Sequence, residues 1–145
     1  MIDLVAVVAT LLSSAMPTVV HKETVERAGS SYDVHYSPLL TLSQKTVGAA
    51  AGTRFSQQKC RWEVTVNAER AINSSEAGKP LVKVLDQKRS FGGEAFGDCR
   101  QNAAAIRSAQ ESRHGEVRQI LQEMAQADRP HVGIDIDAAH ALASN

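Results

Sequence analysis

The residues whose types are best suited to metal binding or catalysis lie in one short segment near the C-terminus, HVGIDIDAAH at 131–140. Two imidazoles and two carboxylates occur within these ten residues: His131, Asp135, Asp137 and His140. Together such groups can hold zinc or another divalent cation, and on an extended strand Asp135 and Asp137 project from the same face. Their spacing matches no recognised ligand pattern, however, and Val132, Ile134 and Ile136 alternate with them as in an ordinary edge strand. We therefore expect a solvated strand face without a metal ion, and keep a metal-assisted hydrolase as an alternative function.

Histidines and glycines elsewhere in the chain do not point to a catalytic centre. His21 and His35 are expected to face each other across a first hairpin, where a histidine pair can bind a metal ion or sense pH, but exposed polar strand residues are the simpler interpretation. The sequence contains no Gly-x-Ser-x-Gly, no His-Glu-x-x-His and no phosphate-binding glycine-rich loop. No catalytic residue is assigned, and no cofactor is predicted.

Cys60 and Cys99 are the two cysteines of the chain. Cys60 begins the core face of the most regular predicted strand and Cys99 begins a predicted helix, so a disulfide between them would join the helix to the sheet. The chain has no Cys-x-x-Cys spacing, and a buried thiol tends to be inert, which disfavours redox or nucleophilic chemistry. Two free thiols are the alternative; we expect a structural disulfide.

The first residues differ in composition from the rest of the chain. Residues 4–12 form an apolar run broken only by Thr10, which suits a signal-peptide core and falls short of the roughly 20 residues of a membrane-spanning helix. Small residues at 13–15 match a signal-peptidase site, although no Lys or Arg precedes the run. We predict a signal peptide at 1–15 and one domain at 16–145, periplasmic or secreted in a bacterium. A short buried N-terminal helix or strand is the alternative.

Composition and charge are those of a folded soluble domain. The 145 residues are 43% hydrophobic and 22% charged, and 16 basic residues balance 16 acidic ones. A net charge of zero creates no global field that would attract phosphate backbones or anionic lipids. We therefore do not expect a nucleic-acid partner, and we expect membrane contact only transiently, through the export signal.

Alternating patterns predict strands in the first part of the chain. The clearest strand lies within 54–72, because residues 59–68 place apolar and polar side chains on opposite faces. A sheet with one solvent-exposed face favours antiparallel pairing. Residues 81–89 are predicted to return beside this strand as the second strand of a hairpin.

Prolines and glycines are expected to interrupt these strands. Pro38 is predicted to separate one strand at 32–36 from another at 39–47, because proline cannot donate a ladder hydrogen bond. The glycines of FGGEAFG, at 91–97, are predicted to lie in turns.

Helix-forming residues dominate from Cys99 to about Ala127. A stripe spaced by three and four residues, apolar except for Arg113, marks one face: Ile106, Ala109, Arg113, Val117, Ile120, Leu121 and Met124. Asp98 is a predicted N-cap with Gln101 three residues later. Gly115 weakens the middle, so two shorter helices can meet near His114, and Pro130 is expected to end the helix.

The sequence thus predicts an α+β fold, an antiparallel β-meander of about four to five strands with a long C-terminal helix packed on one face. The predicted function is a small exported binding or interaction domain that recognises a protein or a small molecule. Besides the hydrolase, an envelope-tethered structural protein that keeps residues 1–15 is an alternative.

Overall fold

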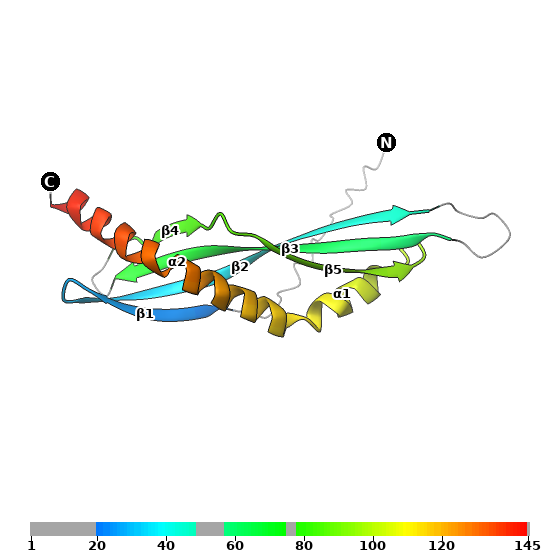
Figure 1. Ribbon diagram of the computed structural model, residues 1–145, viewed down its shortest axis with the longest axis horizontal. Coiled ribbons are helices and arrows are strands. Elements are labelled where there is room, and N and C mark those ends of the chain that lie inside the picture. Colours follow the sequence, from blue (N-terminus) through cyan, green and yellow to red (C-terminus); the bar gives the residue numbers. More distant parts are fainter. Residues whose placement is uncertain (1–19, 49–56, 75–77, 145) are drawn as a thin grey trace, which may run out of the picture.

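The structure, a computed structural model, describes residues 20–48, 57–74 and 78–144. A long, twisted antiparallel sheet carries helices along one face (Figure 1). In chain order the elements are β1 (His21–Arg27), β2 (Ser30–Val47), β3 (Lys59–Ser74), β4 (Leu81–Val84), β5 (Arg89–Phe96), α1 (Ala103–Glu111) and α2 (His114–Ala143). This architecture confirms the predicted fold class. The predicted signal peptide at 1–15 lies outside the described residues.

β3 is the central strand of the sheet. It pairs over its whole length with β2, from Lys59 opposite Val47 to Ser74 opposite Tyr32. Two successive strands share its other edge, because β5 pairs with residues 59–66 and β4 with residues 69–72. The predicted return of the chain beside β3 is therefore confirmed, and it extends further than expected, to the end of β5.

The prediction that the glycines of FGGEAFG lie in turns is wrong for Gly92 and Gly93, which belong to β5, whereas Gly97 lies at a bend directly after this strand. A Cβ on Gly92 would lie 2.3 Å from the carbonyl oxygen of Trp62, and one on Gly93 would lie 3.0 Å from the Trp62 indole. The two glycines allow β5 to approach β3 beneath this indole, which packs edge-on against Phe91 with ring centroids 6.4 Å apart. Here glycine marks a close approach of two strands rather than a bend.

The alternation along β3 separates a buried face from a more solvent-exposed one. Side chains at the even positions from 60 to 72 are buried, whereas those at the odd positions are exposed or half-buried. The core combines these side chains with apolar residues of the other elements, among them Val34, Tyr36, Phe91, Ile106, Val117, Leu121, Met124, Val132 and Ile136.

β2 runs unbroken through Pro38, so the predicted break there is wrong. Pro38 lies opposite Ala68, whose carbonyl oxygen accepts a hydrogen bond from the backbone N–H of Leu85 on the far side of β3. In an antiparallel pair, both opposed residues point their backbone groups toward each other or both point them away. The missing N–H of Pro38 therefore lies on the outer edge of β2 and interrupts no hydrogen bond to β3.

Helix α2 extends along the buried face of the sheet well past Pro130, so the predicted helix end and the predicted edge strand at 131–137 are both wrong (Figure 1). A proline inside a helix loses one backbone hydrogen bond and strains the preceding turn, at a cost of roughly 3 kcal/mol. Burial of Val132 and Ile136 after the proline offsets this cost, because each is almost fully covered by the sheet.

The helical region begins and divides close to where the sequence predicts. Asp98 accepts a hydrogen bond from the N–H of Gln101 at 2.8 Å, although α1 itself starts only at Ala103. α1 and α2 meet at Arg113, directly before His114. The Arg113 guanidinium lies 4.3 Å from the centroid of the Phe91 ring and donates to the carbonyl of Gly92, which holds this junction against β5.

Candidate functional site

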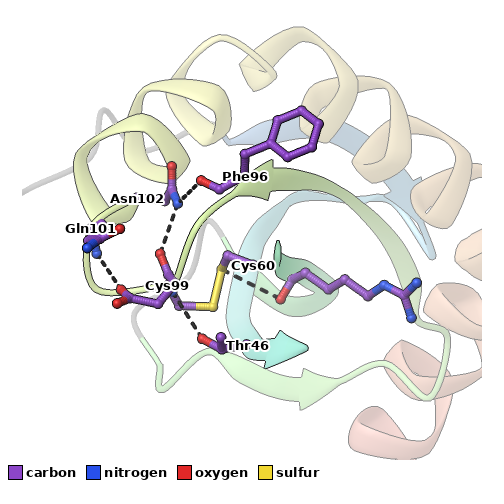
Figure 2. Close-up of a disulfide and its surroundings, with 8 residues drawn as sticks. Thr46, Cys60, Phe96, Cys99, Gln101 and Asn102 are labelled. Atoms are coloured by element: carbon purple, nitrogen blue, oxygen red, sulfur yellow. Dashed lines mark hydrogen bonds between the residues drawn. A yellow bond between two sulfur atoms is a disulfide. The ribbon is translucent and has the colours of Figure 1, made fainter. Parts of the chain in front are cut away.

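The cysteines form the predicted disulfide, which joins β3 to the turn before α1 (Figure 2). The Cα atoms of Cys60 and Cys99 lie 4.8 Å apart, and Cys60 is fully buried. The backbone N–H of Cys99 also donates to the hydroxyl of Thr46 on β2, at 3.1 Å. The bond therefore secures the start of the helical region to the end of the sheet, and it leaves neither cysteine available for thiol chemistry.

The residues of the predicted metal cluster lie on helix α2. Residues two apart do not share a helix face, so Asp135 and Asp137 diverge. Asp135 is hydrogen-bonded by Arg70, and Asp137 by Arg27 through two bonds of 3.0 and 2.5 Å. His140 lies against the hydroxyl of Tyr32.

His131, the fourth residue of the predicted metal cluster, is exposed, and its Nδ1 lies 3.9 Å from the Oδ1 of Asp128. Within residues 20–48, 57–74 and 78–144, no group of three or more His, Cys, Asp or Glu side chains is arranged to hold a metal ion. What the four sequence candidates share is a position on the helix that contacts the sheet.

These contacts are centred on a buried arginine that sequence reasoning missed. Arg70 of β3 is 1% exposed, and its guanidinium donates to Asp128 at 2.8 Å and to Asp135. The hydroxyl of Tyr36 also donates to Asp128, at 3.1 Å. Burial would lower the pKa of Arg70, but the hydrogen bonds to the two aspartates outweigh it and raise this pKa. Burial and the neighbouring Asp128 charge raise the pKa of Tyr36. With these raised pKa values Arg70 stays charged and Tyr36 stays protonated near neutral pH, which suits an anchor rather than an acid–base catalyst.

The first hairpin does not pair its two histidines. His21 lies opposite Tyr36 and His35 lies opposite Lys22, so the two side chains are on opposite faces of the sheet. His21 instead contacts Glu23 at 2.9 Å, and Glu23 in turn accepts hydrogen bonds from Arg129 of α2. This cluster forms a second contact between β1 and the long helix.

An apolar groove of about 310 Å³ lies between β2 and the junction of the two helices. Apolar side chains from four elements form its walls: Leu40 and Leu42 of β2, Val64 of β3, Phe91 of β5 and Val117 of α2. Leu40 and Leu42 are on the same sheet face as the buried core, yet they are 43% and 44% exposed. The groove is therefore core-like surface that no residue of the described ranges covers.

Two polar side chains face this groove, Gln110 of α1 and His114 of α2. The Nε2 atom of Gln110 is inaccessible to solvent, and among the described residues it has no hydrogen-bond partner. A buried donor without an acceptor costs about 1–3 kcal/mol. Since neither Gln110 nor Leu40 and Leu42 belongs to any sequence motif, the sequence offers no signal for this site.

A second cavity, of about 300 Å³, lies at the other end of the sheet beneath the end of α2. Its walls include Tyr32, Ile72, Leu81 and Ile136, with Lys79 and His140 as polar groups. The hydroxyl of Tyr32 and the ring of His140 already bond each other. The groove beside β2, which holds a donor without a partner in the described part of the chain, is therefore the stronger candidate for a binding site.

Comparison of the chain with protein-family models, with curated proteins and with solved structures finds no match. In the part of the chain that the structure describes, neither helix combines the length and the apolar character needed to cross a membrane.

Proposed function

We propose that the protein is a small exported binding module without a catalytic centre, and that the groove between β2 and the α1–α2 junction is its binding site. The observation that carries this proposal is the combination of exposed leucines with a buried amide nitrogen that has no acceptor among the described residues. Binding sites are typically apolar clefts with a few convergent polar groups, and a volume of about 300 Å³ is at the small end of their range.

The chemistry of the groove defines what it binds. Leu40, Leu42 and Phe91 favour an apolar body, and the side chain of Gln110, which lines the groove, can rotate to donate its buried Nε2 to an acceptor on that body. The ligand is a small molecule or a protruding side chain with an apolar surface and a carbonyl or carboxylate oxygen. The alternative hydrolase gains no support from the contacts of Asp135 and Asp137, because each carboxylate is paired with an arginine.

The disulfide supports the proposed export, because such bonds persist in the periplasm and outside the cell but are rare in the cytosol. The mass of the protein recovered from a secreting bacterial host tests this part of the proposal. Cleavage after Ala15 and the absence of titratable thiols are expected. An intact N-terminus, or two free thiols in nonreduced protein, would contradict export as proposed.

A matched pair of probes tests the groove, hexan-2-one with a carbonyl acceptor and n-hexane without one. In amide NMR spectra both probes are expected to shift the backbone signals of Leu40 and Leu42, whereas only hexan-2-one shifts the side-chain amide of Gln110. Hexan-2-one is expected to bind more tightly, by roughly 1 kcal/mol for the added hydrogen bond. Signals that shift only elsewhere, or no shift with either probe, would contradict the assignment.

The sheet itself provides a control variant. Leu42→Asn places a polar group in the groove and is expected to abolish probe binding. Leu39→Asn changes a leucine of similar exposure, 40%, on the opposite face of the same strand, and is expected to leave binding unchanged. Equal loss of binding in both variants would show that the groove is not the site.

A further inference from the structure

The outer edge of β2 beyond Tyr36 has no strand beside it among the described residues. β1 covers only residues 30–36 of β2, while β2 continues to Val47. An exposed edge of this length is a template for pairing with another strand, and proteins usually shorten, charge or cover it. The segment at 37–47 carries a single charge, Lys45, and three leucines that are at least 40% exposed: Leu39, Leu40 and Leu42.

The pairing between β2 and β3 shows which backbone groups face this edge. Because Ala68 directs its carbonyl away from β2, Pro38 directs its backbone groups to the outer edge, and so does every second residue after it. The carbonyl of Gln58 also bonds away from β2, to the N–H of Gly97, and Gln58 follows the same alternation. The N–H and C=O groups of Leu40, Leu42 and Gln44 are therefore the ones available to an added strand.

We propose that this edge pairs antiparallel with the same edge of a second copy of the chain, with Leu42 opposite Leu42 of the second copy on a two-fold axis perpendicular to the sheet. In this register Leu40 lies opposite Gln44 and Pro38 lies opposite Thr46. Residues whose backbone groups point to the outer edge therefore lie opposite one another along the whole contact. The contact stays within residues 38–46 and does not reach the part of β2 that β1 occupies.

Side chains on both faces are compatible with this pairing. On the groove side, the leucines at 40 and 42 of both copies form one apolar cluster across the axis. On the opposite face, Lys45 lies opposite Leu39, so the two lysines are not brought together. A two-fold dimer is the commonest form of soluble oligomer, and this strand is complementary to itself.

The dimer has a consequence for the groove. A two-fold axis perpendicular to the sheet keeps both buried faces on the same side, so the groove of each copy borders the axis. Leu40 and Leu42 then line both the contact and the two grooves. The pairing rests on the backbone of β2 and does not depend on the proposed ligand, although it would make the two binding sites neighbours.

Light scattering and analytical ultracentrifugation of the nonreduced mature protein test this inference. Wild-type protein is expected to form a dimer in a concentration-dependent equilibrium. Gln44→Pro removes an outward N–H without removing a bond to β3, and it is expected to weaken the dimer at least about tenfold, the effect of 1.4 kcal/mol. Gln44→Ala, which keeps that N–H, is expected to dimerise like wild type.

A second pair of variants tests the register and does not depend on tolerance of proline. Leu39→Glu places a carboxylate opposite Lys45 of the second copy and is expected to strengthen the dimer. Leu42→Glu places two carboxylates together at the axis and is expected to weaken it. A dimer that responds to neither pair of variants would use another surface and would overturn the proposal.

A strictly monomeric protein would also overturn the proposal, and hydrogen exchange then identifies the cause. Slow exchange of the Leu40, Leu42 and Gln44 amides in a monomer would show that another part of the same chain covers the edge. Fast exchange would show that the edge is free. Neither result affects the probe experiments on the groove, so failure of the dimer and failure of the proposed function remain distinguishable.

Discussion

Arg70 of β3 and Asp128 of α2 form a buried ion pair, with 2.8 Å between the Arg70 Nη1 and the Asp128 Oδ2 and side-chain exposures of 1% and 7%. The pair links the middle of the long helix to the centre of the sheet. Tyr36 donates to the same carboxylate oxygen, so three elements meet at one atom. Two charges removed from water in this way are tolerated only because each satisfies the other.

Asp128→Ala is expected to destabilise the protein by about 3 kcal/mol or more, because it leaves the Arg70 charge and the Tyr36 hydroxyl buried without their main acceptor. Urea denaturation followed by far-UV circular dichroism measures the change. The matched control is the triple variant Tyr36→Phe, Arg70→Met and Asp128→Leu, which replaces the ion pair by apolar groups of similar size and also removes the hydroxyl that would lose its acceptor. The control is expected to retain most of the stability of wild type; equal loss in both would mean that side-chain packing, rather than charge, dominates here.

Loss of the disulfide is expected to cost about 4 kcal/mol in the chain-entropy model for a bond that closes a loop of this size. The double variant Cys60→Ala with Cys99→Ala, compared with wild type in nonreducing urea denaturation, measures this loss. Wild type with a reducing agent should approach the double variant. No change in stability on reduction would show that the turn before α1 is held by other contacts, such as the bond from Cys99 to Thr46.

The sequence predicts the sheet better than the second half of the long helix. The alternation along β3 is unbroken and correctly indicates antiparallel pairing with one wet face. In α2 the buried positions after Val117 are 120, 121, 124, 125, 128, 132 and 136, so the helical period continues through Pro130. One of these positions holds Asp128, and a charge within an apolar stripe hides the period from a search for apolar residues alone.

The groove could not be predicted for a different reason. Leu40 and Leu42 continue the alternation of β2 and predict burial as strongly as Val34 does. Whether they are covered depends on how far β1 extends and where α1 and α2 meet, and both are features of the tertiary structure. That the Nε2 of Gln110 has no acceptor among the described residues likewise follows from its neighbours in space and not from its neighbours in the chain.

Pro130→Ala is expected to stabilise the protein by about 2 kcal/mol. The substitution restores a backbone hydrogen bond to the carbonyl four residues earlier and relieves the strain of the ring, while the greater freedom of alanine in the unfolded chain offsets part of this gain. Thermal and urea unfolding measure the change. A loss of stability would indicate that the path of α2 over the twisted sheet requires the proline.

Acidification is expected to weaken the contacts between β1 and α2. Hydrogen bonds from Arg27 lower the pKa of Asp137, and for Glu23 the effect of burial, which raises its pKa, is outweighed by hydrogen bonds from His21 and Arg129, which lower it. A carboxyl whose pKa is lower in the folded state stabilises that state above its unfolded pKa of about 4, and this contribution is lost as the pH falls through the folded pKa.

Melting temperatures measured from neutral pH down to about pH 2 test this prediction, with a decline expected below about pH 4. The double variant Glu23→Gln with Asp137→Asn is expected to be less stable at neutral pH and to show a shallower decline. A variant that declines as steeply as wild type would assign the acid sensitivity to carboxylates other than these two.

Gln110→Leu is expected to separate stability from binding. Since the Nε2 of Gln110 is buried without an acceptor in the described part of the chain, its replacement by an apolar side chain of similar size removes an unsatisfied donor and should stabilise the protein by about 1 kcal/mol. The same change removes the hydrogen bond offered to a ligand and leaves the ketone oxygen buried without a donor, so the variant should bind hexan-2-one more weakly than n-hexane. A polar group that costs stability but improves recognition is typical of a binding site. If the variant is instead less stable than wild type, Gln110 supports the fold, and the groove loses the feature that distinguishes it from an ordinary surface hollow.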